Sequence, residues 1–183
     1  HTLRFLAAHR ERLPGQRFAI NLAPSTVCRV QFPLEVSRLL AKYAIEPWQL
    51  IFEVTECSTF GSGEQALHIL QQLQKMGVRI AIDDFGTGYA SYARLKSVDA
   101  DILKIDGSFI RNIVNNSLDY QIVASICHLA RMKKMLVVAE YVETEEIRSA
   151  VHALGIDYVQ GYLIGKPVAL ESLAETEAST ADA

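Results

Sequence analysis

Two adjacent aspartates, Asp83 and Asp84, follow the apolar run 80–82 and precede a glycine-rich stretch, residues 86–88. The apolar run is typical of the end of a buried strand, where an ionised carboxylate is unfavourable, and the glycines are typical of a loop. Adjacent like charges repel each other unless a cation lies between them. The pair therefore either faces water on two sides of a turn or shares a metal ion.

Polar side chains also end five further runs that we expect to form strands. The six runs cover residues 17–23, 50–56, 79–84, 102–106, 135–140 and 157–162. The polar residues at or near their ends are Asn21, Glu53, Glu56, Asp83, Asp84, Lys104, Asp106, Glu140 and Gln160. In a parallel α/β barrel all strand ends meet on the face where active sites form, whereas in a doubly wound sheet only the ends at the switch point do. Since all six ends are polar, the pattern favours a barrel.

Stretches with i, i+3, i+4 apolar spacing lie between these runs and predict helices over residues 32–44, 63–77, 118–134 and 143–155. Strands that alternate with helices predict an α/β fold with a parallel sheet covered by helices. We expect a single domain over residues 1–183 that is the C-terminal portion of a longer protein. Residues 1–13 would end a helix from the preceding part, and residues 171–183 would form a loose tail.

The oxygen-rich donor set at these strand ends predicts a site for hard cations. Its members are Asn21, Glu53, Asp83, Asp84 and Glu140, which offer carboxylate or amide oxygens. Such ligands select Mg²⁺ or Mn²⁺. They are too many for one Mg²⁺, which keeps several waters, and they suit two ions about 3.5–4 Å apart, the usual arrangement for in-line displacement at phosphorus. One of the adjacent aspartates would then bridge the two ions.

Lys104 faces the same mouth, where it could position or deprotonate the attacking water or stabilise charge on the phosphate. Gln160 could orient that water. Taken singly, each acidic residue also has a structural interpretation as a helix N-cap or turn former, and Lys104 could form an ion pair with Asp106 inside the barrel. The joint pattern over six strands favours the catalytic interpretation. The five histidines fall in predicted helices, which argues against a histidine-bound zinc ion or a Ser-His-Asp triad.

Composition excludes several other classes of protein. The chain has 183 residues, 50% of them hydrophobic and 21% charged, and a net charge of −3. These values are ordinary for a globular domain and leave no basic face for long nucleic acid. No apolar run approaches the ~18 residues needed to span a bilayer, and no signal peptide opens the chain. Three cysteines at unrelated spacings predict free thiols in a reducing cytoplasm, although the parent protein could carry a membrane anchor elsewhere.

Five stretches resemble the EAL family, bacterial phosphodiesterases that open cyclic di-GMP to linear pGpG. In family order across residues 17–167 they are INLAPSTV, FEVTE, AIDDFGTGYASYARLKSVDADILKIDGSFI, VVAEYVET and DYVQGYLIGKP. The resemblance implies a TIM-type (β/α) barrel. The family's Glu-Ala-Leu stretch is absent, which implies that about six of eight strands are present.

The resemblance also implies roles for individual residues. Two Mg²⁺ or Mn²⁺ ions would be held by Asn21, Glu53, Asp83, Asp84 and Glu140, with Asp83 as the bridge. Lys104 would activate or position water, with Glu143 and Gln160 close by. Glu56 would tether the loop of residues 85–93, which in the family joins substrate binding to dimer formation.

We therefore expect the parent protein to be a dimeric cyclic di-GMP phosphodiesterase with an N-terminal GGDEF or sensory domain. The chain alone would be weak or inactive, because it would lack a metal ligand and leave strand edges unpaired. The alternative is a non-catalytic cyclic di-GMP receptor, and a third possibility is a glycosidase with two opposed carboxylates and no metal. Tyr141 stands where the family commonly has glycine, beside Glu140, and we interpret it as a subfamily variant whose ring could narrow the site.

Overall fold

Six parallel strands form one sheet in which neighbours in sequence are neighbours in space. The structure, a computed structural model, describes residues 1–13, 15–55, 63–86 and 99–173. Its strands are β1 (Phe18–Asn21), β2 (Leu50–Thr55), β3 (Arg79–Phe85), β4 (Ile102–Ile105), β5 (Leu136–Ala139) and β6 (Tyr158–Val159). Every neighbouring pair is parallel, so the predicted α/β class is confirmed.

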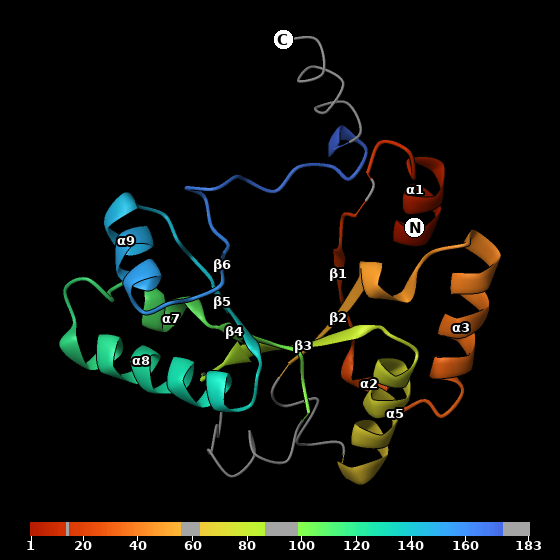
Figure 1. Ribbon diagram of the computed structural model, residues 1–183, viewed down its shortest axis with the longest axis horizontal. Coiled ribbons are helices and arrows are strands. Elements are labelled where there is room, and N and C mark those ends of the chain that lie inside the picture. Colours follow the sequence, from red (N-terminus) through yellow and green to blue (C-terminus); the bar gives the residue numbers. More distant parts are fainter. Residues whose placement is uncertain (14, 56–62, 87–98, 174–183) are drawn as a thin grey trace.

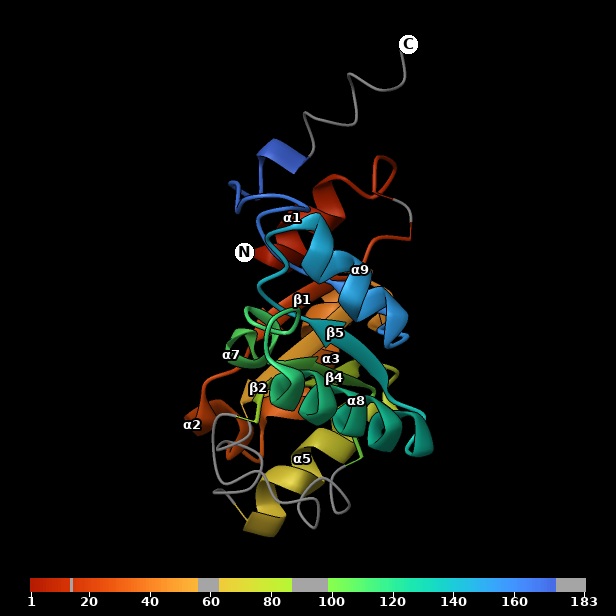
Figure 2. The same cartoon turned by 90° about the vertical axis from the view of Figure 1, so that its left-hand side faces the viewer.

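Helices follow the strands and cover the outer side of a curved sheet (Figures 1 and 2). They are α1 (Thr2–Ala8), α2 (Pro24–Val27), α3 (Phe32–Tyr43), η1 (Pro47–Gln49), α5 (Gly63–Lys75), α7 (Gly107–Ile110), α8 (Ser117–Met132) and α9 (Glu145–Ala153). In Figure 1, α3 and α5 lie on the side of β1 and β2, and α8 and α9 lie on the side of β4 to β6. Within the described residues β1 and β6 are the two edges, so the sheet is a six-stranded half-barrel, as predicted for an incomplete TIM-type barrel.

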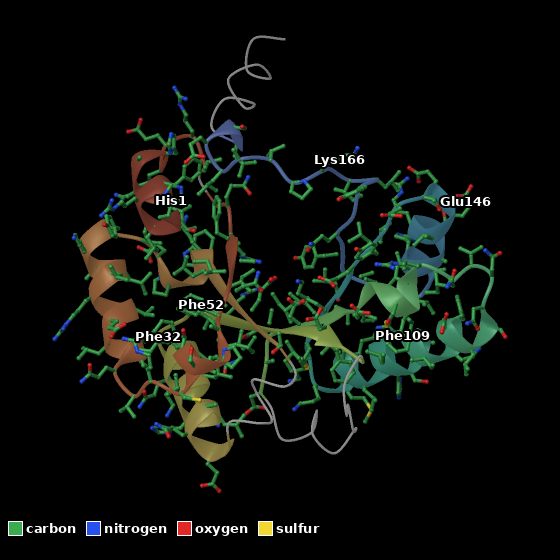
Figure 3. The ribbon with its side chains drawn as sticks, turned by 180° about the vertical axis from the view of Figure 1, so that it is seen from behind. His1, Phe32, Phe52, Phe109, Glu146 and Lys166 are labelled. Atoms are coloured by element: carbon green, nitrogen blue, oxygen red, sulfur yellow. The ribbon has the colours of Figure 1, made fainter. Side chains whose placement is uncertain are left out.

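The core lies between the sheet and the helices, because strand side chains alternate between the two faces. In β2, Leu50, Phe52 and Val54 are buried against the helices. Phe52 contacts Phe32 of α3 with ring centroids 5.8 Å apart, and Figure 3 shows the two side by side. Burial of one such side chain contributes about 1.5–3 kcal/mol. The outward residues of the strands therefore hold the helices in place.

The inward residues of the strands line a hollow of about 250 Å³ on the concave face of the sheet. They are Arg17, Ala19, Ile51, Glu53, Arg79, Ala81, Ile102, Lys104, Leu136, Val138, Tyr158 and Gln160. Arg17 directly precedes β1 and Arg79 begins β3, whereas Glu53 and Lys104 lie in the second halves of β2 and β4. The alternation of the strands thus directs polar groups inward at the carboxyl end of the sheet.

The N-terminal helix α1 ends at Ala8 and is therefore shorter than the predicted segment 1–13. Arg10 instead donates hydrogen bonds from Nη2 to the carbonyl oxygens of Tyr43 (2.8 Å) and Ala44 (2.9 Å) at the C-terminal end of α3. Of the expected loose tail, Glu171 contacts the His1 ring at 3.1 Å, and residues 174–183 lie outside the described part. No helix in the described part of the chain is both long enough and apolar enough to cross a membrane.

Asp101 joins the starts of three strands. Its Oδ2 accepts hydrogen bonds from the Ile80 amide (2.8 Å) and Gln74 Nε2 (3.0 Å), and its carbonyl accepts from the Leu136 amide (2.9 Å). We expect Asp101→Ala to lower the free energy of unfolding in urea by about 1–3 kcal/mol, because the Ile80 amide loses its partner. The control Asp99→Ala should change it by less than about 0.5 kcal/mol, because the Asp99 side chain is 83% exposed. Equal losses for the two variants would contradict this role.

Candidate active site

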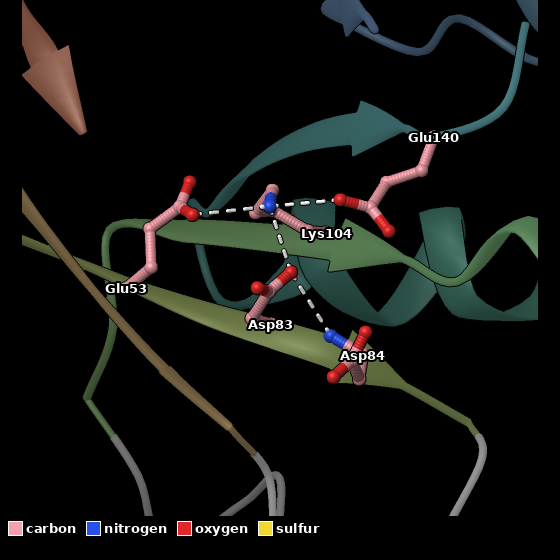
Figure 4. A network of polar contacts seen from close by, with 5 residues as sticks. All are labelled: Glu53, Asp83, Asp84, Lys104 and Glu140. Atoms are coloured by element: carbon pink, nitrogen blue, oxygen red, sulfur yellow. Dashed lines mark hydrogen bonds and ion pairs between the residues drawn. The ribbon is translucent and has the colours of Figure 1, made fainter. Parts of the chain in front are cut away.

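A buried lysine at the carboxyl end of β4 contacts three carboxylates from three other segments (Figure 4). Lys104 Nζ lies 2.7 Å from Asp83 Oδ1, 2.8 Å from Glu140 Oε1 and 3.2 Å from Glu53 Oε2. Lys104 is 5% exposed. Among the residues that the structure describes, it is the only charged one that is buried. A buried ammonium must be paired to be tolerated, and here its three donor hydrogens match three acceptors. The suggested ion pair with Asp106 is wrong.

Asp106 instead has the structural role considered for single acidic residues. Its Oδ1 accepts a hydrogen bond from the Ser108 amide (2.8 Å), so it is the N-cap of α7. Asp106 therefore fixes the start of the helix that directly follows the strand of Lys104.

The adjacent aspartates face the same mouth because β3 is irregular at this point. Neighbouring residues of a regular strand point to opposite faces. Between Ile82 and Phe85 the register against β4 shifts, and Asp84 has a left-handed backbone with φ +55°. A bulge of this kind re-aims a side chain. As a result, carboxylate oxygens of Asp83, Asp84 and Glu140 all lie within 4.8 Å of one another.

Burial and mutual repulsion shift the pKa values of these groups. Burial alone would lower the pKa of Lys104, but its hydrogen bonds to Asp83 and Glu140 outweigh burial and raise the pKa. Burial raises the pKa of Glu53 and of Glu140, and the ammonium of Lys104 offsets only part of this. Burial and the charge of Asp83 also raise the pKa of Asp84. One ammonium thus contacts three carboxylates, and the negative charge of Asp84 lies beside them.

These shifts predict that the metal-free chain is more stable in mild acid than at neutrality. A carboxyl whose pKa is raised in the folded state keeps its proton above its ordinary value of 4.5, so stability falls as pH rises through that window. The raised pKa of Lys104 adds no slope there, because lysine is protonated in both states. In chelator, the unfolding temperature should fall from about pH 5 to about pH 7, and less steeply for Glu140→Gln. Identical slopes for the two proteins would contradict the prediction.

The other predicted site residues lie around this cluster or outside the described part. Asn21 ends β1 beside Glu53, its register partner on β2. Glu143 and Gln160 line a neighbouring hollow of about 490 Å³ together with Glu140, Tyr141, Gly161 and Tyr162. Glu56, proposed as the loop tether, lies outside the described residues, as do residues 87–93 of its loop.

One contact near the cluster has no local signal in the sequence. Tyr141 packs on α7, where the guanidinium carbon of Arg111 lies 3.8 Å from its ring centroid. The two residues are thirty positions apart, so periodicity and spacing do not connect them. In the sequence, Tyr141 is distinguished only by its position, where the EAL family commonly has glycine.

Comparison with known proteins agrees with this geometry. The family model of the EAL domain matches residues 1–167, which is most of the chain. The chain belongs to the EAL-domain family. The curated relatives of this EAL domain include the cyclic di-GMP phosphodiesterase PdeF of Escherichia coli K12, 71% identical over 97% of the chain and 24% of PdeF. The probable cyclic di-GMP phosphodiesterase PdeA of the same strain is 48% identical over 90% of the chain and 23% of PdeA. The chain thus spans about a quarter of the length of these relatives.

Solved structures of EAL domains share the fold. The PaMucR phosphodiesterase in complex with c-di-GMP superimposes with a TM-score of 0.86 at 37% identity, over 93% of this chain and 70% of that one. The EAL domain of Mycobacterium smegmatis DcpA gives 0.90 at 30% identity, over 97% and 80%. The predicted family and barrel class are therefore confirmed.

The acidic cluster of this EAL domain has the donor chemistry for a metal ion. Asp83, Asp84 and Glu140 offer only oxygen atoms, close enough together to share one cation. The Lys104 ammonium already lies against Asp83 and Glu140, which shows that the cluster accommodates positive charge.

Proposed function

We propose that this EAL domain hydrolyses cyclic di-GMP to linear pGpG by in-line attack of water on phosphorus. The observation that carries the proposal is the buried contact of Lys104 with Asp83, Glu140 and Glu53 at the mouth of the half-barrel. The names of the relatives, cyclic di-GMP phosphodiesterases at up to 71% identity, support this substrate.

Two Mg²⁺ or Mn²⁺ ions are the cofactors that the donor set fits best. Their ligands would be Asn21, Glu53, Asp83, Asp84 and Glu140, with Asp83 shared. Bound there, such ions would polarise a phosphoryl oxygen and lower the pKa of water. The residues lie on β1, β2 and β3 and directly after β5, all strands of one sheet, so the sheet holds them with little reorganisation.

Lys104 would hold the attacking water and stabilise charge that develops on the phosphate. Its raised pKa keeps it protonated in the metal-free chain, so it acts there as a hydrogen-bond donor. Glu143 and Gln160, which line the adjacent hollow, would orient the water or the substrate. Glu56 would tether the loop of residues 85–93.

The partners and setting of this domain follow from the same proposal. We propose a homodimer formed through the loop after Asp84, a GGDEF or sensory domain on the N-terminal side in the parent protein, and a cytoplasmic location. The curated relatives are about four times longer than this chain, which leaves room for such domains. Light scattering of the parent protein with and without residues 85–93 would test the dimer.

The decisive experiment is hydrolysis of cyclic di-GMP with Mg²⁺ or Mn²⁺, by this chain and by a form extended at its N-terminus. We expect pGpG from the extended form, loss of product in EDTA, and a drop of about 10²–10⁴-fold for Lys104→Ala. Lys75→Ala, at an exposed position on α5, is the control and should retain activity. Tight binding without product would favour the receptor alternative, and hydrolysis that EDTA leaves unchanged would overturn the metal mechanism.

A further inference from the structure

Tyr141 has a backbone conformation that a side chain disfavours. It directly follows Glu140, and its φ is +59°, in the left-handed region. Glycine adopts this region freely, whereas other residues are strained there and persist only where their surroundings hold them. Tyr141 is 46% exposed, so burial of the ring in the core does not account for the strain.

Contacts of the ring with α7 are what hold Tyr141 in place. A Cβ atom added to Gly107 would lie 2.3 Å from Cδ2 of Tyr141, so the ring occupies the space that glycine leaves open. The guanidinium carbon of Arg111 lies 3.8 Å from the ring centroid, within cation–π range. The Arg111 amide bonds to the Gly107 carbonyl (2.9 Å), so both contacts come from one helical turn.

The backbone on either side of Tyr141 is tied to other elements. The Glu140 amide donates to the Ile105 carbonyl on β4 (3.2 Å), and the Val142 amide donates to the Gln160 carbonyl after β6 (3.0 Å). Tyr141 adds the link to α7, which begins two residues after β4 ends. The segment that carries Glu140 is therefore held against the same element that carries Lys104.

We propose that Tyr141 is a positioning residue that fixes the carboxylate of Glu140 through the contact of its ring with α7. Asp83 and Asp84 lie on β3, whereas Glu140 follows β5. The distance between them therefore depends on how the end of β5 is held against β4, the strand between the two. The strain of a non-glycine residue is retained because the ring stabilises this arrangement. The effect on metal binding rests on the proposed function, whereas the effect on the backbone does not.

The test is a double-mutant cycle between Tyr141 and Gly107. Tyr141→Gly removes the ring and relieves the backbone, and Gly107→Ala places a methyl group where the ring lies. On the metal-free chain, we expect each change to speed amide hydrogen exchange at Glu140 and Val142 by about tenfold or more, while amides of β2 stay unchanged. The double variant should be no worse than Tyr141→Gly, because the three atoms nearest to the added methyl group all belong to the Tyr141 side chain and are then gone. Tyr141→Phe keeps the ring and should behave as the wild type.

Mn²⁺ binding by calorimetry provides the second measurement. Loss of a group that orients a metal ligand weakens affinity by about 10–100-fold, and we expect this for Tyr141→Gly and Gly107→Ala but not for Tyr141→Phe. Unchanged exchange at Glu140 and Val142, or faster exchange with unchanged Mn²⁺ affinity, would overturn the proposal. So would a higher KM for cyclic di-GMP with unchanged Mn²⁺ affinity, since the ring would then contact substrate. If the wild type bound no Mn²⁺, the proposed metal mechanism would fail, and the exchange cycle would decide the role of Tyr141.

Discussion

Asp83→Asn should lower kcat for cyclic di-GMP hydrolysis by about 10³-fold, because metal-ion stabilisation of the transition state is worth several kcal/mol and Asp83 would bridge the two ions. Asp83 also makes the shortest contact with Lys104, 2.7 Å, and accepts the Asp84 amide at 3.1 Å. Asparagine keeps the volume and one acceptor oxygen but loses the charge. The amide hydrogens would also face the ammonium of Lys104 unfavourably.

Turnover of the N-terminally extended form over a range of Mn²⁺ concentrations up to saturation measures the effect, with calorimetry to follow metal binding. The matched control is Asp99→Asn, an exposed aspartate just before β4, which should retain wild-type kcat. A loss that excess Mn²⁺ fully restored would show that Asp83 contributes affinity alone. Wild-type kcat for Asp83→Asn would contradict its place in the reaction.

Lys104→Met should lower the free energy of unfolding of the metal-free chain by about 3–5 kcal/mol at neutral pH, the range found when one partner of a buried ion pair is removed. Methionine fills a similar volume but leaves three carboxylates without their cation. Two of these, Glu53 and Glu140, have side chains only 12% and 15% exposed. The effect is therefore electrostatic.

Urea unfolding in chelator, repeated at about pH 5 and about pH 7, separates charge from packing. Protonation removes the charge of the unpaired carboxylates in the variant, so the decrease in the free energy of unfolding should be smaller at about pH 5. Mn²⁺ should restore part of this free energy at about pH 7. Lys75→Met, at an exposed position on α5, should change stability by less than about 0.5 kcal/mol. An equal loss at both pH values would show that lost packing explains the effect.

The positions of most elements could be predicted from the sequence. The apolar runs at 50–56 and 79–84 correspond to β2 and β3 within one residue, because burial of alternate residues against helices demands that pattern. The run at 157–162 was predicted too long, since β6 covers only Tyr158–Val159. Within the described residues β6 has one neighbouring strand, β5, so backbone pairing does not extend it further.

The candidate site could be predicted in its residue types but not in its contacts. Spacing placed Glu53, Asp83, Lys104 and Glu140 at strand ends, which in a parallel sheet share one edge. Spacing suggested Asp106 as a partner for Lys104, but Asp106 is a helix cap. The three carboxylates that Lys104 contacts come from other segments. The contact of Tyr141 with α7 could not be predicted from spacing either, because it joins two segments that are brought together only by tertiary packing.

By itself the sequence determined the order of strands and helices, the oxygen-donor chemistry at the strand ends, and the family. These properties follow from local pattern, because burial and strand alternation act over a few residues. Only the tertiary structure decided that Asp83 and Asp84 face one mouth, since a shift in register and a left-handed residue redirect the strand there. It also brought Lys104 to Glu53, 51 positions away, because contacts across a sheet depend on how whole strands pair.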